Sequence, residues 1–206
     1  MIAPPKFLLY NLKKEGGNMN TMLILPSRKY FGSYLEACKE FEDKGEHSFL
    51  HDIYEFAHLK RGSQITFEAW KKGIIHQYYF DTVDGKYQML DVPATTFWLV
   101  NENEYLGIGT IRHRLTKAIE EYGGHIGYAI RPSKWNQGYG KLHLKLLLKE
   151  AYKLKINPAL VTCEETNIPS SKVIEANGGK LWDKLPIHSN GKEVLLNRYW
   201  VPTNIK

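Results

Sequence analysis

The spacing of hydrophobic residues along the chain changes near Val92. Between Phe31 and Tyr78, large apolar residues recur every three or four positions, which is the pattern of amphipathic helices. From Val92 onward they come in short runs separated by polar turns, which predicts strands. The expected helices cover 31–41, 49–60, 63–78, 141–154 and 169–177, and the expected strands cover 22–25, 95–100, 105–115, 123–130, 159–164, 180–187 and 193–201. The pattern predicts one α/β (α+β) domain with a helical lobe at about 31–80 and a strand-rich core at about 92–202.

Short polar signals predict where several of these elements end. Ser33 and Glu36 form the pattern of a capping box near the start of the first helix, and Ser63 is placed to cap the third. The run Met22–Leu25 stops at a proline and is expected to be an edge strand. Residues 189–191 predict the turn of a closing hairpin.

The first 21 residues read as an extension ahead of a single domain that spans 22–206. Their apolar run is too short for the core of a signal peptide, and no small-residue cleavage site follows it. Glu15–Gly17 can be encoded by a purine-rich stretch that resembles a bacterial ribosome-binding site. We therefore expect residues 1–21 to be disordered or wrongly assigned to the gene, with translation starting at Met19 or Met22. Mass spectrometry of native protein that begins at the first methionine would contradict this.

Composition narrows the class of protein. With 206 residues, 43% of them hydrophobic, the chain can bury a core, and no apolar run approaches the ~20 residues of a membrane span. Cys38 and Cys163 are far apart and lack metal-ligand spacing, so we expect no metal and a cytoplasmic protein. The net charge of +6 is scattered, so we expect neither nucleic acid nor a membrane as partner. A small polyanionic ligand would account for part of the charge, and so would a solvated surface.

Gly138 and Gly140 stand between an expected strand and an expected helix, in the sequence GGHIGYAIRPSKWNQGYG. Glycines let the main chain approach a ligand closely, and the N–H groups of a helix N-terminus favour a phosphate. The segment is not a Walker loop, because Trp135 stands at its first glycine position and a leucine follows Lys141. It is not a dinucleotide fingerprint, because the third glycine position holds His143. We therefore expect a phosphate-bearing ligand of another class.

The glycine-rich loop resembles the coenzyme A loop of the GNAT superfamily of N-acetyltransferases, which reads Arg or Gln, two residues, Gly, one residue, then Gly or Ala. Both glycines match, and Trp135 replaces the leading Arg or Gln. A second segment, CEETNIPSSKVIEANGGKLW, is similar to the family's next strand and helix, with Asn167, Ser170 and the pair Gly178-Gly179 in place. The resemblance covers about residues 92–202 and is typical of a bacterial branch of the superfamily.

This resemblance implies a GNAT-like mixed, mostly antiparallel sheet flanked by helices, and an acetyl-CoA-dependent N-acetyltransferase. The acetyl group would pass directly to a primary amine of a small molecule or a protein, and a homodimer stays open. The resemblance assigns cofactor binding to Tyr128, Ala129, Ile130, Trp135, Asn136, Gln137, Gly138, Tyr139, Gly140, Lys141, Asn167 and Ser170. Two rivals stay open: a non-catalytic acyl-CoA-binding module with the same fold, and a basic RNA- or ribosome-associated protein.

The catalytic residues are less defined. The family's usual acid is a tyrosine seven positions after the asparagine, and that position holds Ile174. Acetyl transfer needs a neutral amine, and because a lysine-type amine has a pKa of ~10.4, a base or a water molecule must remove a proton. Candidate bases are His125, which opens the cofactor strand, and Glu164 and Glu165, which end the second strand. A main-chain N–H near the end of 128–130 is the expected oxyanion donor.

Most of these residues also have a purely structural interpretation. The two loop glycines could form only a strand-to-helix turn, Asn167 could be only a helix N-cap, and Ser170 could serve packing. His125 could cap a strand at the surface. Tyr199 could reach the site or lie in the core, and Cys163 could carry an acyl group or be an ordinary buried strand cysteine. The sequence leaves these alternatives open.

Overall fold

The computed structural model describes residues 8–14, 17–46, 66–75, 79–83, 86–90, 92–189 and 192–205. The chain forms two compact units. The first contains Met1–Gln77, Thr96–Ile108 and Ile130–Asn136, and the second contains Tyr78–Thr95, Gly109–Ala129 and Gln137–Lys206.

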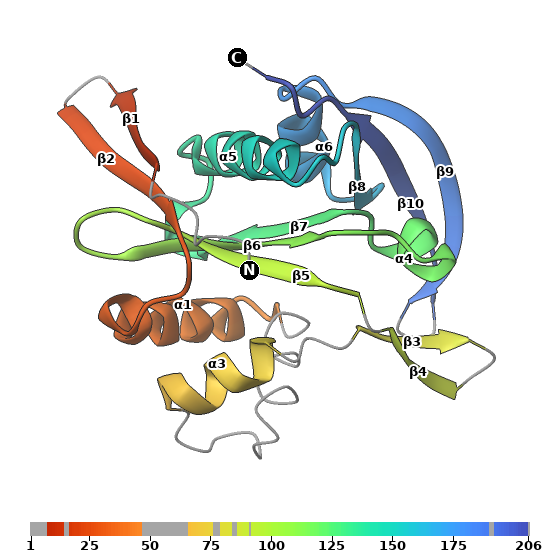
Figure 1. Cartoon of the computed structure of the whole chain (residues 1–206), viewed down its shortest axis with the longest axis horizontal. Helices are drawn as coiled ribbons and strands as arrows, with labels where there is room; N and C mark the ends of the chain where they lie inside the picture. The colour runs from red at the N-terminus through yellow and green to blue at the C-terminus, as the bar shows by residue number, and fades with distance from the viewer. Residues whose placement is uncertain are drawn as a thin grey trace. The chain divides into compact units, whose positions relative to one another are not determined.

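Eight strands form one sheet, and two more form a separate hairpin (Figure 1). The strands are β1 (Leu8–Lys14), β2 (Gly17–Ile24), β3 (Tyr79–Val83), β4 (Lys86–Leu90), β5 (Ala94–Val100), β6 (Tyr105–Arg112), β7 (Ile126–Ile130), β8 (Ala159–Glu164), β9 (Lys180–Ser189) and β10 (Lys192–Val201). The large sheet has the order β1-β2-β5-β6-β7-β8-β10-β9, and β3 pairs with β4. β7 pairs with β8 in parallel, whereas β1–β2, β2–β5, β8–β10 and β9–β10 are antiparallel. The predicted mixed, mostly antiparallel sheet is confirmed.

Both units also contain helices. They are η1 (Arg28–Tyr30), α1 (Phe31–Asp43), α3 (Phe67–Ile75), α4 (Lys117–Tyr122), η2 (Pro132–Lys134), α5 (Tyr139–Lys153) and α6 (Ile168–Glu175). α1 buries Phe31, Tyr34, Cys38 and Phe41, so the periodicity that predicted this helix is confirmed. The chain leaves α1 at Gly45, whose φ of +73° suits glycine.

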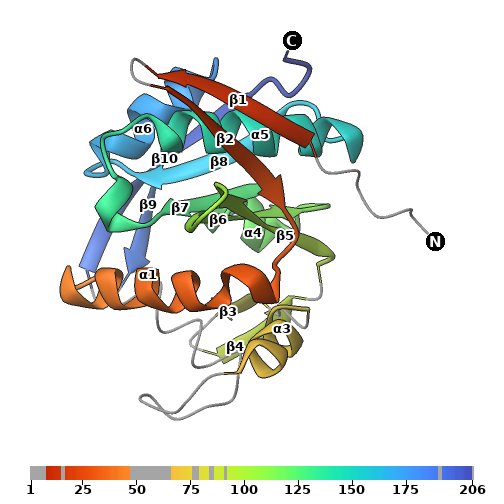
Figure 2. The same ribbon diagram turned by 90° about the vertical axis from the view of Figure 1, so that its left-hand side faces the viewer.

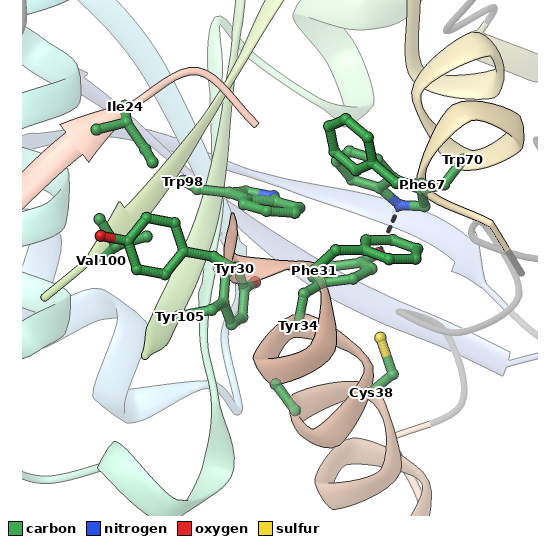
Figure 3. Close-up of a cluster of buried hydrophobic side chains, with 11 residues drawn as sticks. Ile24, Tyr30, Phe31, Tyr34, Cys38, Phe67, Trp70, Trp98, Val100 and Tyr105 are labelled. Carbon is green, nitrogen blue, oxygen red and sulfur yellow. Dashed lines mark hydrogen bonds between the residues drawn. The ribbon is translucent and has the colours of Figure 1, made fainter. Parts of the chain in front are cut away.

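Aromatic side chains form the core of the first unit (Figure 3). We define the aromatic cluster as Phe31, Tyr34, Phe67, Trp70, Trp98 and Tyr105. The Trp98 ring centroid lies 4.9 Å from that of Trp70 and 5.0 Å from that of Tyr34. Trp70 Nε1 donates a hydrogen bond of 2.8 Å to the Tyr34 hydroxyl, drawn as a dashed line in Figure 3. Packing of these rings therefore joins α1, α3 and the parts of β5 and β6 that belong to this unit.

The predicted capping box at the start of α1 is wrong. Tyr30 is the N-cap residue and makes no side-chain cap. Ser33 Oγ instead accepts hydrogen bonds of 3.1 Å from the Tyr105 main-chain N–H and from Arg131 Nη1. The Ser33 hydroxyl therefore binds groups that are distant in sequence instead of capping the helix.

Arg131, the residue just before η2, is a buried charged residue of the first unit. Only 6% of its side chain is exposed, and it pairs with Glu40 of α1 and with Glu104, 3.2 Å away. Glu40 Oε2 also accepts the Ser133 N–H at 2.9 Å. Burial raises the pKa of Glu40, but hydrogen bonds from Arg131 and Ser133 outweigh it, so the pKa falls below its ordinary value. The network ties α1 to the segment that precedes the glycine-rich loop.

In the second unit, α5 and α6 lie side by side on one face of the strands (Figures 1 and 2). Leu144, Leu147, Leu148 and Ala151 of α5 are fully buried at helical spacing, so the helix expected at 141–154 is confirmed. α6 also packs against β8 and β10. The closing β9–β10 hairpin was predicted correctly as well. Among the residues assigned to cofactor binding, α5 holds Tyr139, Gly140 and Lys141, and α6 holds Ser170.

Several other predictions need correction. Met22–Leu25 does not form an edge strand, because β2 lies between β1 and β5. The β3–β4 hairpin and α4 were missed, since their segments carry weak periodicity. The third helix begins at Phe67, and Thr66 Oγ1 accepts the Ala69 N–H at 3.2 Å. The helix expected at 49–60 and the cap expected at Ser63 lie outside the described residues.

Candidate functional site

β7 separates from β8 soon after the two strands meet. Within the described residues their parallel ladder registers at one pair, Ile126 with Val161. Just before it, the His125 N–H donates to the Leu160 carbonyl at 2.7 Å, and the Leu160 N–H donates to His125 Nδ1 at 2.9 Å. Tyr128 lies beyond this pair on β7, so its main chain has no registered partner on the described part of β8. A strand edge of this kind can hydrogen-bond an extended ligand.

The glycine-rich loop enters α5 through left-handed main chain. Gly138 is the N-cap residue of α5 with a φ of +84°, and Asn136 has a φ of +58°. A Cβ at Gly138 would meet nothing within 4 Å, so a side chain is disfavoured there by backbone strain alone. The first N–H groups of a helix lack intrahelical partners and carry partial positive charge. The expected strand-to-helix turn is confirmed, and its geometry suits an anion.

The assigned loop residues divide between the two units. Ile130, Trp135 and Asn136 belong to the first, and Gln137, Gly138, Tyr139, Gly140 and Lys141 belong to the second. Trp135 Nε1 donates to the Ile130 carbonyl at 2.6 Å, so the residue that replaces the family's Arg or Gln braces the main chain before the loop. The Lys141 side chain is exposed, and its carbonyl accepts from Asn177 Nδ2 at 3.2 Å.

Asn167 and Ser170 lie at the start of α6. Asn167 is the N-cap residue, and its side chain accepts the Ser170 N–H at 3.1 Å, with Pro169 in the first turn. The N-cap interpretation of Asn167 is therefore confirmed, and its contact with a cofactor stays a prediction. The Ser170 hydroxyl lies 3.1 Å from the Tyr128 hydroxyl, so these two assigned cofactor residues touch each other.

A chain of hydroxyl and thiol groups extends from this contact. We define the hydroxyl chain as Tyr128, Ser170, Cys163, Ser171, Tyr199 and Glu175. Cys163 Sγ lies 3.3 Å from Ser171 Oγ, and the side chains of Ser170 and Ser171 both act to lower the pKa of Cys163. The Ser171 side chain acts to lower the pKa of Tyr199, whose hydroxyl donates to Glu175 Oε1 at 3.4 Å. Glu175 is exposed. The hydroxyl chain therefore connects β7 to solvent through β8, α6 and β10.

Burial keeps the acidic groups inside the hydroxyl chain protonated. It raises the pKa of Tyr128 to about 12 and raises the pKa values of Tyr199 and Cys163. A thiol with a raised pKa is a poor nucleophile, and Cys163 is buried in β8. The interpretation of Cys163 as an ordinary strand cysteine is favoured over the acyl carrier. Tyr199 lies in the core, with 3% of its surface exposed.

The three candidate bases do not share one environment. Burial, and then the charge of Arg112, lowers the pKa of His125 to about 4, and its Nδ1 already accepts the Leu160 N–H. Glu164 is exposed at the end of β8. Glu165 forms an ion pair with Lys184. The geometry gives His125 a strand-anchoring role, and a base role for any of the three stays a prediction.

Ile174 occupies the family's acid position and is fully buried. A Cβ added to Gly179 would lie 2.5 Å from Ile174 Cγ2, so Gly179 is packed closely against Ile174 and a side chain does not fit at 179. The sequence missed the Tyr128 side chain, because the resemblance assigned that residue through its main chain. The only available signal was a tyrosine inside the cofactor strand.

Two buried polar side chains near the hydroxyl chain have no hydrogen-bond partner in the described structure. They are His143, at both ring nitrogens, and Asn197, at Oδ1. The His143 ring lies 6.3 Å from the Tyr128 ring, and burial lowers the pKa of His143 to about 3. Asn197 pairs with Cys163 in the β8–β10 register. Buried polar groups normally find partners, so these two side chains are exceptions to the rule within the second unit.

Two other kinds of feature are absent from the part of the chain that the structure describes. His, Cys, Asp and Glu side chains do not gather there in threes as a metal ion would require. None of the helices there has the length and apolar character needed to cross a bilayer.

Solved structures with a similar fold include acetyltransferases. RimL, the ribosomal L7/L12 alpha-N-protein acetyltransferase in complex with coenzyme A, matches with a TM-score of 0.54 and 17% identity over 87% of this chain and 92% of its own. The GNAT-family acetyltransferase from Bacillus anthracis gives 0.53 and 18% over 90% and 96%. A chimera of the Vibrio cholerae spermidine N-acetyltransferase SpeG with hSSAT gives 0.52 and 13% over 89% and 96%.

Other matches are shorter. In two acetyltransferase structures with TM-scores of 0.45 and 0.44, the chain spans 63% and 66% of the other protein's length. No curated protein sequence matches the chain. The sequence model described as the acetyltransferase (GNAT) domain matches residues 51–180, which is more than half of the chain. On that match, together with the sheet and the turn into α5, this protein belongs to the GNAT acetyltransferase family.

Proposed function

We propose that this protein is an acetyl-CoA-dependent N-acetyltransferase that passes the acetyl group directly to a primary amine. One observation carries the proposal. The β7 edge that has left β8 leads, through the loop, into left-handed Gly138 at the N-terminus of α5. An unpaired strand edge can bind an amide-containing arm, and a helix N-terminus can bind a diphosphate. Coenzyme A combines both groups in one molecule.

The residues present fit this ligand. The main chain of 128–130 would hold the pantetheine arm, and the N–H groups of 135–140 would hold the diphosphate. Asn167 and Ser170, at the start of α6, would contact the arm from the second segment. Trp135 contributes no charge, so the diphosphate would depend on main-chain donors and on the helix dipole. The exposed Lys141 side chain can add a positive charge at the mouth of the loop.

Acetyl-CoA would supply a thioester whose carbonyl carbon accepts the amine. A main-chain N–H near the end of β7 would stabilise the negative charge that develops on the carbonyl oxygen. A base, for which Glu164, Glu165 and His125 stay the candidates, or a water molecule would take the proton from the amine. Proton supply to the departing sulfur is the step for which the family's usual tyrosine is missing.

The acceptor belongs to a broad class, a primary amine of a small molecule or of a protein. The names of two structural relatives cover both kinds of acceptor, since RimL is named for ribosomal protein L7/L12 and SpeG for the small molecule spermidine. The net charge of +6 repels a polycation and slows its association. It attracts an acceptor whose amine is accompanied by negatively charged groups and speeds its association. We therefore favour an acceptor of neutral or acidic character over a polyamine.

An acetyl-CoA thiol-release assay across a panel of amines tests the proposal. The panel should include spermidine, amino acids, aminoglycosides and peptides with acidic N-termini. We expect release above the hydrolysis rate with at least one primary amine, and none when the amine is blocked. Binding of acetyl-CoA without release across the panel would favour the rival function, an acyl-CoA-binding module, which the buried Ile174 at the acid position supports.

A further inference from the structure

The Tyr128 hydroxyl reaches the helix that carries the acid in related enzymes. It lies 3.1 Å from Ser170 Oγ, and Ser170 is four residues before Ile174 on α6. Residues four apart on a helix share a face and lie about one turn apart. A tyrosine hydroxyl is therefore present about one turn of α6 from the position where the family places one, but it comes from the strand.

This hydroxyl is also joined to solvent. Cys163 Sγ lies 3.3 Å from Ser171 Oγ and also interacts with Ser170, and Ser171 interacts with Tyr199, whose hydroxyl reaches exposed Glu175. Hydroxyl and thiol groups both donate and accept hydrogen bonds, so each link can reverse its direction. A continuous chain of such groups can carry a proton from the surface to a buried end.

We propose that the Tyr128 hydroxyl donates to the departing sulfur of acetyl-CoA, and that the rest of the hydroxyl chain resupplies its proton from solvent. The proposal rests on the proposed function. Tyr128 acts as the catalytic residue, because its hydroxyl contacts the sulfur. Ser170, Ser171 and Tyr199 are positioning residues that act through it.

The step balances as follows in atoms and charge. The amine nitrogen forms a bond to the acetyl carbon, and the C–S bond breaks with its electron pair on sulfur. Tyr128 gives its hydroxyl proton to the sulfur while Ser170 gives one to Tyr128, and the shift continues along the hydroxyl chain to water at Glu175. The amine loses one proton to solvent. Amine and thioester become amide and thiol, with no net change in protons.

Burial suits Tyr128 to this role in one respect and limits it in another. A pKa of about 12 keeps the hydroxyl protonated at neutral pH, so it is always able to donate. The same pKa makes a free phenolate costly, because a thiol is several units more acidic. The resupply through Ser170 removes that cost, because no phenolate needs to accumulate.

Binding measurements on Tyr128→Phe test the contact without relying on turnover. The thiol of bound coenzyme A is titrated by the ultraviolet absorbance of its thiolate, and affinity is measured for coenzyme A and for desulfo-coenzyme A. The variant loses a hydrogen bond to the charged sulfur. We therefore expect the ratio of thiolate to thiol in bound coenzyme A to fall about tenfold at a given pH. Affinity for desulfo-coenzyme A should stay within about twofold, because no sulfur is present to accept.

Turnover and control variants complete the test. Tyr128→Phe should lower kcat by about 100-fold, in the range of a lost general acid. Tyr152→Phe, on the exposed side of α5, is the matched control and should change neither measurement. If Tyr128→Phe does not fold, Ser170→Ala keeps the tyrosine, removes its partner, and should raise the pKa of the bound thiol in the same direction.

The outcomes separate the two proposals. An unchanged thiol titration in both Tyr128→Phe and Ser170→Ala, with coenzyme A still bound, overturns the role of Tyr128 and leaves the proposed function standing. Wild-type protein that binds neither coenzyme A nor desulfo-coenzyme A overturns the proposed function and this inference with it.

Discussion

The two units bury different kinds of side chain. The aromatic cluster of the first unit is packed from rings, and within it Trp70 Nε1 donates a hydrogen bond to the Tyr34 hydroxyl. Within the described residues, Trp98 Nε1 and the Tyr105 hydroxyl have no hydrogen-bond partner. The second unit instead keeps a connected hydroxyl chain under α6, with a tyrosine at each end of its buried part. One interior stabilises the fold by packing, and the other retains groups that can move a proton.

This difference follows from what each kind of burial costs. Apolar burial contributes roughly 25 cal/mol per Å², and closely packed rings add to it. Buried hydroxyls contribute little once they are bonded to each other, and they cost about 1–3 kcal/mol each when left unpaired. A hydroxyl chain is therefore a poor way to stabilise a core and a good way to connect a buried atom to water.

The largest effect should come from the aromatic cluster. Trp98→Ala removes a fully buried indole, so the free energy of unfolding should fall by about 3–5 kcal/mol in urea denaturation. The matched control is Trp182→Ala, whose ring is 47% exposed and lies 4.3 Å from the Arg198 guanidinium. That change should cost about 1 kcal/mol. Equal losses in the two variants would contradict the central role of the cluster.

Acid should weaken the second unit through His143. Its folded-state pKa of about 3 lies below the ordinary ~6.5, so the unfolded chain binds a proton that the folded chain does not. Stability is complete above pH ~6.5 and falls as the pH drops toward ~3. Over this pH interval, the free energy of unfolding of wild type should fall by at least about 2 kcal/mol more than that of His143→Leu. Denaturation at a series of pH values measures both.

His125 and Glu40 add acid sensitivity that both proteins share, because their pKa values are also lowered. The comparison between wild type and His143→Leu therefore isolates one side chain. Identical pH profiles would show that His143 has a partner that the described structure does not contain.

Gly138→Ala should affect the loop more than the fold. The substitution forces a side chain into left-handed main chain, which costs roughly 1–2 kcal/mol. If the loop relaxes to avoid this strain, affinity for coenzyme A should fall about 5–30-fold, the equivalent of the same energy. Gly32→Ala in α1, where a Cβ also has open space, is the control and should be neutral or stabilising by up to about 1 kcal/mol. A weaker response from Gly138→Ala than from Gly32→Ala would contradict the assignment of the loop.

The smallest effect on stability should come from Tyr199→Phe. It removes a hydroxyl whose bond to Glu175 is long at 3.4 Å, so unfolding should change by about 1 kcal/mol or less. Turnover should nevertheless slow, and the solvent isotope effect on kcat should change, because proton resupply is interrupted. A variant with wild-type turnover and isotope effect would limit the hydroxyl chain to a structural role.

Local pattern predicted the elements that carry strong periodicity. The helix α5, the turn at the glycines ahead of it and the closing hairpin were all predicted, because spacing and turn chemistry determine them. β1, α4 and the β3–β4 hairpin were not, since short segments of weak pattern depend on their neighbours. The misplaced capping box has the same cause, as the Ser33 hydroxyl binds Tyr105, 72 positions away in the chain.

The candidate site shows the same limit. Resemblance assigned residues along two segments, but it could not show that the Tyr128 side chain meets Ser170 or that Tyr199 meets Glu175. These contacts join β7 and β10 to α6, and only the folded chain brings them together. The sequence did show that the usual acid was missing, at Ile174, and the structure shows that this side chain is fully buried.

Isothermal titration with acetyl-CoA tests the central claim most directly, because every later step depends on the cofactor being bound. The account predicts saturable binding of one acetyl-CoA per chain with Kd in the range of about 1 μM to 1 mM, typical of enzyme substrates. It also predicts weaker binding to Gly138→Ala and unchanged binding to Gly32→Ala. Absence of binding by wild-type protein to both acetyl-CoA and coenzyme A would contradict the account.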